Sequence, residues 1–326
     1  MLYPTHKILV VCGPTAVGKT KLALELAGLF GGELVCADAR QIYKGLDILS
    51  GKDIPSGYSY KLSGLRDGAR QLGYFGNGTK IWLVSHIEIS ATCTAYDYQR
   101  AATIVISDIQ ARGMLPVLVG GTGLYINSLL DSFSLSSVKP DYHLRRILNN
   151  KPVDYLRDLL QKHDPSRLAS MNRSDRANPR RLIRAIEIAA EKNSEKARIG
   201  RPQYDYLMVG LTAPMHVIEK RIADRIDDRI NRGVLNEAYR IMPELKPDMA
   251  VYTELGLPIL MGVINRKLSL AEAKKKWFVR ERRYVKRQLT WFKKDKKIIL
   301  FDVSRPSAIS DIIAVVKSWY TYENAD

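Results

Sequence analysis

One eight-residue stretch near the N-terminus constrains the fold of this chain more than any other. It reads Gly-Pro-Thr-Ala-Val-Gly-Lys-Thr over residues 13–20, after a short apolar run at 8–11 and before a helical pattern of leucines. A strand, a glycine-rich turn and a helix N-terminus in this order form the context of a phosphate-binding loop. The glycines let backbone N–H groups converge on an anion, and the helix dipole adds partial positive charge.

The motif predicts a polyphosphate ligand but does not specify which one. Lys19 supplies a full positive charge, and Thr20 supplies a hydroxyl for Mg²⁺ or for a phosphate oxygen. The predicted phosphate-binding residues are Gly13, Pro14, Thr15, Ala16, Val17, Gly18, Lys19 and Thr20.

Length and charge narrow the class of protein. The chain has 326 residues, enough for one large domain with a sizeable insertion or for two domains. Its 51 Lys and Arg against 34 Asp and Glu give a net charge of +17, which attracts nucleic acid or acidic lipid or simply aids solubility. No apolar run is long enough to span a membrane, and residues 1–6 lack a signal-peptide core. Three scattered cysteines (Cys12, Cys36 and Cys93) fit a reducing cytoplasm.

An acid follows the second predicted strand, residues 33–37. Asp38 stands at the carboxyl end of that strand, where open α/β sheets bind their ligands beside the phosphate loop. It is therefore a candidate base, a candidate Mg²⁺ partner or a simple helix cap. Arg40 and Gln41 follow in the same loop and are candidates for holding the edge of a nucleobase.

A third buried strand, predicted over 115–119, runs into the sequence Gly-Gly-Thr-Gly-Leu-Tyr. No acid ends this strand, which counts against an ATPase motor, because many phosphate-loop nucleotidases place their Mg²⁺-binding Asp there. Thr122 instead offers a hydroxyl at the sheet edge. A plain glycine turn that opens a helix is the alternative interpretation.

The rest of the chain completes an α/β pattern. We expect strands at 80–84, 206–211 and 298–303, and helices at 95–111, 216–240, 269–294 and 307–320. Residues 51–80 lack a clear period except for a hairpin signal at 76–78. In the helix at 269–294, Trp277, Tyr284 and Trp291 form one stripe that predicts core packing, with an edge facing a polyanion. The pattern predicts a phosphate-loop parallel sheet flanked by helices.

A basic helical insertion interrupts this pattern. Residues 139–191 show helical periodicity with little strand signal, so we place a core at 1–135 and 203–326 and an insertion at 136–202. Arg180, Arg181 and Arg184 are neighbours on one predicted helix. Such a cluster is either a solvated face or a set of phosphate contacts, and both interpretations stay open.

Taken together, these residues resemble the tRNA dimethylallyltransferase family, also called tRNA isopentenyltransferases. The resemblance covers almost the whole chain, and the order and spacing of its motifs are specific. The motifs are Gly13 to Thr20, Asp38 to Ile48, Gly120 to Tyr125, Asn178 to Ala185, Arg221 with Arg225, and Lys286 to Trp291.

The resemblance implies a phosphate-loop fold that binds dimethylallyl diphosphate rather than ATP. It implies transfer of the five-carbon unit to N6 of the adenosine 3′-adjacent to the anticodon in tRNA. By motif, Lys19, Thr20 and Arg225 would contact the diphosphate, and Asp38 would accept the N6 proton. The residues implied to hold the tRNA anticodon stem-loop are Asp38, Ala39, Arg40, Gln41, Thr122, Arg145, Arg180, Arg181, Leu182, Ile183 and Arg184. Mg²⁺ at Thr20, a cytoplasmic monomer and no membrane contact complete the expectation.

The sequence departs from the family pattern in three places. Ala39 replaces the usual Ser, and residues 49–53 read Leu-Ser-Gly-Lys-Asp instead of Gly-Thr-Ala-Lys-Pro. The segment from 56 to 80 is longer than usual, and the expected His-His pair is reduced to His86. These changes bear on substrate positioning and not on the class of reaction. No Cys follows Cys93, so the zinc finger of eukaryotic relatives is absent.

Three other functions remain open. An adenylate isopentenyltransferase would keep the chemistry and act on a free nucleotide. A small-molecule kinase would use the phosphate loop on ATP, with Asp38 as the base for a substrate hydroxyl. The third alternative is a non-catalytic RNA-binding nucleotidase, and the main argument for it is the net charge of +17. The basic insertion and the Arg-rich aromatic helix favour tRNA, because a mononucleotide needs neither.

Overall fold

The computed structural model describes residues 6–65, 70–130, 138–191, 204–246, 249–253 and 256–321. The chain divides into two compact units. The first combines Met1–Asp131 with Pro202–Asp326, and the second is Ser132–Arg201. The insertion boundaries predicted at 136 and 202 lie outside the described residues.

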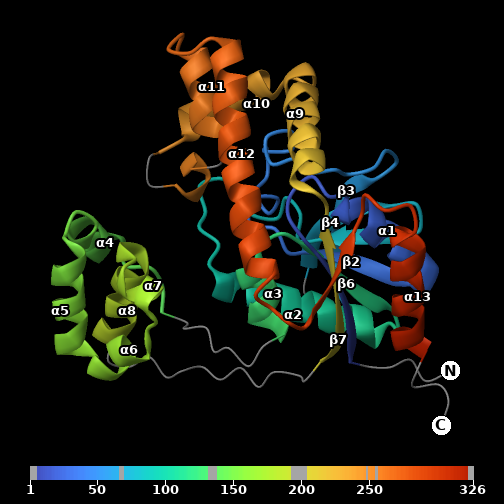
Figure 1. Ribbon diagram of the computed structural model, residues 1–326, viewed down its shortest axis with the longest axis horizontal. Helices are drawn as coiled ribbons and strands as arrows, with labels where there is room; N and C mark the ends of the chain where they lie inside the picture. Colours follow the sequence, from blue (N-terminus) through green and yellow to red (C-terminus); the bar gives the residue numbers. More distant parts are fainter. Residues whose placement is uncertain are drawn as a thin grey trace. The chain divides into compact units, whose positions relative to one another are not determined.

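The first unit is built on a sheet that, within the described residues, has eight strands in the order β3-β4-β5-β2-β6-β1-β7-β8 (Figure 1). Six neighbouring strands are parallel: β5 (Thr79–Trp82), β2 (Gly32–Cys36), β6 (Leu115–Gly120), β1 (Lys7–Cys12), β7 (Asp205–Thr212) and β8 (Ile298–Asp302). The predicted α/β class is therefore confirmed.

An antiparallel hairpin extends the β5 edge of the sheet. It consists of β3 (Ser59–Gly64) and β4 (Arg70–Gly76), and β4 joins β5 through a tight turn. Asn77 and Gly78 have φ angles of 47° and 77°, as a two-residue hairpin turn requires. The hairpin signal at 76–78 is thus confirmed. β3 was not predicted, because its exposed residues lack the apolar run that marks the other strands.

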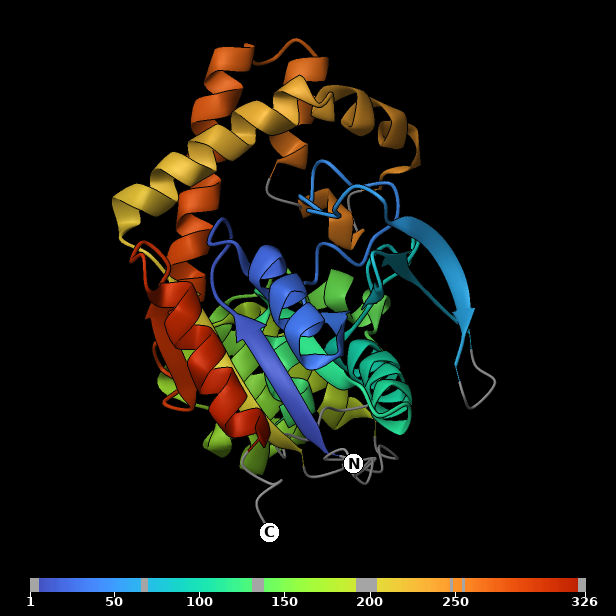
Figure 2. The ribbon, with the colours of Figure 1, turned by 90° about the vertical axis from the view of Figure 1, so that its right-hand side faces the viewer.

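Helices cover both faces of the parallel strands, which explains why β1 and β6 read as continuous apolar runs. On one face lie α1 (Lys19–Phe30) and α13 (Ala308–Thr321), where Phe30 packs edge-on against Tyr320 (Figure 2). On the other lie α2 (Ala95–Ala111) and α3 (Gly123–Leu130), where Tyr98 stacks on Tyr125 at 3.9 Å between ring centroids.

A helical group joins β7 to β8 within the first unit. It contains α9 (Met215–Asn231), α10 (Val234–Ile241), the 3₁₀ turns η1 (Met242–Glu244) and η2 (Ala250–Thr253), α11 (Leu257–Ile264) and α12 (Leu270–Phe292). The single helix predicted over 216–240 is wrong. Gly233, with φ 87°, breaks it and starts α10 in a new direction. α11 was also missed, because its eight almost uniformly apolar residues carry no helical period.

The second unit is helical, as predicted. Its described helices are α4 (Tyr142–Leu148), α5 (Val153–His163), α6 (Pro165–Ser170), α7 (Arg173–Arg176) and α8 (Pro179–Ala190). They enclose a small core of Leu148, Leu156, Leu160, Leu182, Ile183, Ala185 and Ile186. Leu182 and Ile183, two of the residues predicted to contact tRNA, have their side chains in this core. The apolar face of the amphipathic α8 buries them in this core.

Candidate active site

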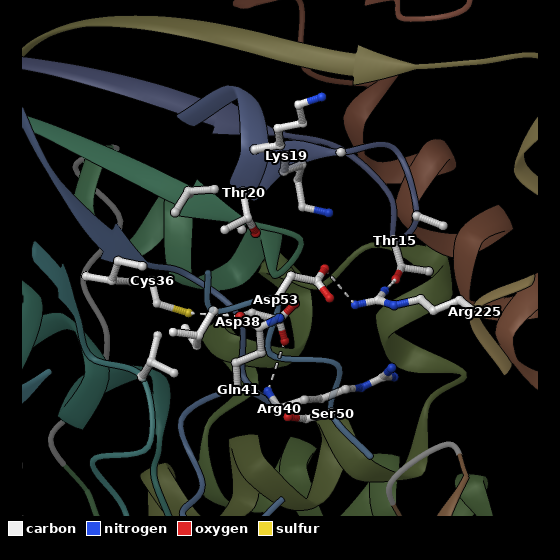
Figure 3. Close-up of a pocket in the computed structure, with 18 of the residues that line it drawn as sticks. Thr15, Lys19, Thr20, Cys36, Asp38, Arg40, Gln41, Ser50, Asp53 and Arg225 are labelled. Carbon is white, nitrogen blue, oxygen red and sulfur yellow. Dashed lines mark hydrogen bonds and ion pairs between the residues drawn. The ribbon is translucent and has the colours of Figure 1, made fainter. Parts of the chain in front are cut away.

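A cavity of about 560 Å³ opens in the first unit at the carboxyl ends of the parallel strands (Figure 3). Its lining comes from the phosphate loop, the ends of β2 and β6, the loop after β2, and helices α9 and α12. This is the edge at which open α/β sheets bind ligands, as the sequence predicted.

The phosphate loop has the backbone of an anion cradle. Gly18, at φ 87°, turns the chain into α1, and Ala16 also has a positive φ of 66°. Gly13 has to lack a side chain, because a Cβ there would lie 2.5 Å from the carbonyl oxygen of Leu211. The first N–H groups of α1 consequently point at the cavity with no side-chain cap.

Lys19 lies across this loop. Its Nζ donates a hydrogen bond to the carbonyl oxygen of Pro14 at 2.6 Å, and the residue lines the cavity beside Thr20. Burial lowers the pKa of Lys19 to about 8, and the nearby Asp38 carboxylate works against that shift. A bound anion would therefore stabilise the charged form of this amine.

Three arginines of α9 line the cavity at four-residue spacing: Arg221, Arg225 and Arg229. Arg225 donates to the Thr15 hydroxyl at 2.7 Å and pairs with Asp53 at 3.0 Å (Figure 3). Arg229 is buried and pairs with Glu281 at 3.2 Å. Burial, followed by the charge of Arg225, lowers the pKa of Arg229 to about 10. Arg221 also contacts the phosphate loop, because its Nη1 donates to the Ala16 carbonyl at 3.4 Å, but the Arg225 contact is the shorter of the two.

The loop that carries Asp38 is hydrogen-bonded to Thr122, because the two residues follow the adjacent strands β2 and β6. The N–H of Ala39 donates to the Thr122 hydroxyl at 2.9 Å, and the N–H of Thr122 donates to the Ala37 carbonyl at 3.1 Å. Asp38 Oδ1 accepts one bond from the N–H of Arg40 at 3.0 Å, and the carboxylate lines the cavity. Thr122 thus holds the loop that presents Asp38.

Two members of that loop are engaged by other parts of the unit. The Arg40 guanidinium lies over the ring of Tyr284 at 3.7 Å from its centroid, which is a cation–π contact. Gln41 Nε2 donates to the Gly51 carbonyl at 3.0 Å. The predicted aromatic stripe of α12 is core packing at Trp277, which is 1% exposed, whereas Tyr284 lines the cavity.

Gln288 is a site residue that sequence reasoning did not select. Its Oε1 accepts from the N–H of Thr15 at 3.0 Å, and its Nε2 donates to the Gly121 carbonyl at 2.9 Å. One α12 side chain therefore connects the phosphate loop to the glycine-rich loop after β6. Its place in the Lys286 to Trp291 motif was the only available signal.

Except for Arg40, the arginines predicted to hold RNA lie in the second unit, and most of these have internal partners. Glu187, whose side chain is fully buried, accepts from Arg145 at 2.6 Å and from Arg184 at 3.1 Å. Arg181 pairs with Asp175. Arg180 is exposed and has no ionic partner among the described residues. The sequence could not distinguish these internal pairs from a free basic face.

The cavity offers oxygen donors that suit a hard cation: the Thr20 hydroxyl and the carboxylates of Asp38 and Asp53. Within the described ranges, no cluster of three or more His, Cys, Asp or Glu could hold a metal ion unaided. The residues therefore fit a Mg²⁺ ion only together with phosphate oxygens of a ligand. No helix in the described part of the chain is long and apolar enough to cross a membrane.

The fold and the cavity define a phosphate-loop α/β protein in which the cationic anion cradle after β1 and the acid after β2 line one cavity, with β6 between the two strands. The sequence model of the IPP transferase family matches residues 41–295, and the chain belongs to that family.

Two curated relatives are similar over nearly their whole length. The tRNA dimethylallyltransferase of Geobacillus thermodenitrificans is 34% identical over 316 residues, covering 93% of this chain and 92% of the relative. The tRNA dimethylallyltransferase of Halalkalibacterium halodurans is 32% identical over 309 residues, covering 92% of each chain.

Solved structures agree with this assignment. The tRNA isopentenylpyrophosphate transferase of Bacillus halodurans matches with a TM-score of 0.68 and 30% identity, covering 98% of both chains. A eukaryotic dimethylallyltransferase acting on tRNA matches with a TM-score of 0.74 over 98% of this chain and 80% of its own. Its identity is 23%, so it supports the fold alone.

Proposed function

We propose that this protein transfers a dimethylallyl group from dimethylallyl diphosphate to N6 of the adenosine 3′-adjacent to the anticodon in tRNA. The observation that carries the proposal is one cavity that joins the phosphate loop, Arg225 and Asp38 in a member of this family. The fold supplies an anion cradle after β1 and a carboxylate after β2 at the same edge of the sheet, which are the two groups that this reaction needs.

The donor side of the reaction belongs to the phosphate loop. As the bond between carbon 1 and the diphosphate oxygen breaks, negative charge develops on the leaving diphosphate. The loop N–H groups, Lys19 and Arg225 would absorb that charge, and such preorganised stabilisation is usually the largest catalytic contribution. A bound Mg²⁺, held by Thr20 and diphosphate oxygens, would neutralise further charge on the leaving group.

The acceptor side belongs to Asp38. The exocyclic amine of adenosine is a weak nucleophile, and it forms the new carbon–nitrogen bond more readily when a carboxylate takes its proton. Asp38 lines the cavity, and its carboxylate accepts a hydrogen bond from the N–H of Arg40 through Oδ1, which leaves acceptor capacity for a substrate proton. The stacked adenine has to leave the anticodon loop to reach this position.

The apolar part of the lining suits a five-carbon chain. Leu24, Ile54, Ile81, Val84 and Val119 line the cavity beside the charged groups. A pocket of mainly apolar walls with a few fixed polar groups is the usual form of a small-ligand site. A kinase acting on a polar hydroxyl substrate would not need this apolar wall.

Binding of RNA is supported by charge. The net charge of +17 and the exposed basic residues of the second unit, Arg180 among them, favour a polyanionic acceptor over a mononucleotide. We further propose that the enzyme acts in the cytoplasm, where its acceptor is found.

To test the proposal, purified protein is incubated with labelled dimethylallyl diphosphate and either unmodified tRNA or AMP. A separate reaction contains labelled ATP. We expect label to move from dimethylallyl diphosphate to tRNA alone. Equal transfer to AMP would identify an adenylate isopentenyltransferase. Phosphoryl transfer from ATP, without prenyl transfer, would identify a kinase.

A further inference from the structure

The loop at residues 46–53 is anchored by a carboxylate that is remote in the sequence. Glu237, on α10, is 5% exposed. Its Oε2 accepts from the N–H groups of Asp47 and Ile48, both at 2.9 Å, and its Oε1 accepts from the N–H of Leu49 at 2.7 Å. Bonds from backbone N–H groups to an ionised acceptor are among the stronger hydrogen bonds in proteins, so this anchor is firm and directional.

The 46–53 loop is tightly wound, so an anchor at 47–49 also fixes residues 51 and 52. The N–H of Gly51 donates to the Ile48 carbonyl at 3.1 Å, and the N–H of Lys52 donates to the Asp47 carbonyl at 3.0 Å. The buried Lys52 side chain closes the turn from the other side, because its Nζ donates to Asp47 Oδ1 at 2.7 Å. These bonds tie the residues of the loop to one another and to Glu237.

The Gly51 carbonyl connects the 46–53 loop to the active site. It accepts from Arg225 Nη2 at 2.8 Å and from Gln41 Nε2 at 3.0 Å. Gly51 has φ +64°, and a Cβ there would lie 2.3 Å from the guanidinium nitrogens of both Arg225 and Arg229. The guanidinium of Arg225 is thus aimed by a backbone oxygen whose position the loop sets.

We propose that Glu237 is a positioning residue of the diphosphate site, acting through the 46–53 loop and the Gly51 carbonyl to hold Arg225 against the phosphate loop. Glu237 is absent from the cavity lining in the described part of the chain, so it acts at a distance from the substrate. The inference rests on the proposed role of Arg225 as a diphosphate contact.

The first experiment measures binding of inorganic diphosphate to the full-length protein by calorimetry. Glu237→Gln keeps the shape but turns an N–H₂ group toward backbone N–H groups, which loosens the loop. We expect the affinity for diphosphate to fall about tenfold. The KM for dimethylallyl diphosphate should rise by a similar factor while the KM for tRNA stays constant. Glu244→Gln, an exposed control just beyond α10, should change neither value.

A double-mutant cycle with Arg225→Ala separates positioning from general destabilisation. If Glu237 acts through Arg225, then Glu237→Gln should weaken diphosphate binding no further in the Arg225→Ala background. Additive losses would overturn the proposal, as would native diphosphate affinity in Glu237→Gln. If the native protein itself binds no diphosphate, the proposed function fails before the question of Glu237 arises.

Gly51→Ala tests the same route without altering Glu237, and it serves if Glu237→Gln does not fold. The added methyl group would clash with the guanidiniums of Arg225 and Arg229 and displace them, and alanine is also strained at the positive φ of Gly51. Diphosphate affinity should again fall about tenfold, with tRNA affinity retained. Unchanged diphosphate binding in Gly51→Ala would show that the loop does not aim Arg225.

Discussion

Arg225 donates a hydrogen bond to the Thr15 hydroxyl at 2.7 Å, although the two residues are 210 positions apart. This contact joins α9 to the phosphate loop, so the anion cradle is completed by a helix that follows the inserted unit in the sequence. The phosphate loop alone would bind a generic polyphosphate. The added guanidinium gives the cradle a second fixed cation, which suits a leaving group that gains charge in the transition state.

Removing either fixed cation should slow turnover. We expect Lys19→Ala and Arg225→Ala each to lower kcat/KM for dimethylallyl diphosphate by at least about two orders of magnitude with folding retained. Lys220→Ala is a matched control, because this exposed lysine of α9 pairs with Asp224 and does not line the cavity. Near-native turnover in Lys19→Ala would contradict the assignment of the phosphate loop.

Diphosphate binding should depend on pH through Lys19. Burial lowers the pKa of this amine to about 8 in the unliganded protein. Below that pH the amine is charged and attracts the anion, and above it the charge is lost, so affinity should fall as pH rises through 8. Lys19→Arg stays charged throughout and should flatten the profile. Calorimetric titrations at several pH values check this, and parallel profiles for the two proteins would contradict it.

Asp38→Asn should separate chemistry from binding. The amide keeps the shape of the side chain but cannot accept the N6 proton, so single-turnover rates should collapse while tRNA affinity changes little. Filter binding measures the affinity independently. Loss of tRNA binding with a native rate at saturation would make Asp38 a positioning residue instead of the base.

The second unit predicts different outcomes for two neighbouring arginines. Arg180 is exposed, so Arg180→Ala should weaken tRNA binding and flatten its salt dependence by about one unit of log–log slope. Arg184 holds the buried Glu187 and the Val138 carbonyl, so Arg184→Ala should mainly lower the melting temperature. The reverse pattern would show that Arg184 contacts RNA and Arg180 does not.

The sequence predicted the α/β core well because its parallel strands, buried on both faces, contain apolar runs such as 8–11 and 115–119. The sequence also placed Asp38 and Thr122 each at the end of a strand, where such sheets bind ligands. The prediction of a single helix over 216–240 failed, because the helical pattern continues through Gly233, and only the positive φ of that residue marks the break.

The sequence could not predict which polar side chains bond to loops that are remote in the chain. Glu237 and Gln288 look like ordinary helix positions, and their partners are loops more than 150 positions away: Glu237 bonds Leu49 at a separation of 188, and Gln288 bonds Thr15 at 273. The sequence left the basic segment at 180–184 ambiguous for a related reason. Charge pattern does not show whether an arginine faces solvent or a buried acid such as Glu187.

The most direct test of the account is to locate the transferred group. Unmodified tRNA is incubated with the protein and dimethylallyl diphosphate, digested to nucleosides and fragments, and mapped by mass spectrometry. We predict one product, N6-dimethylallyladenosine, at the position 3′-adjacent to the anticodon, formed by the native protein and not by Asp38→Asn. A prenyl group on another atom or at another position, or none on tRNA while AMP is prenylated, would contradict the account.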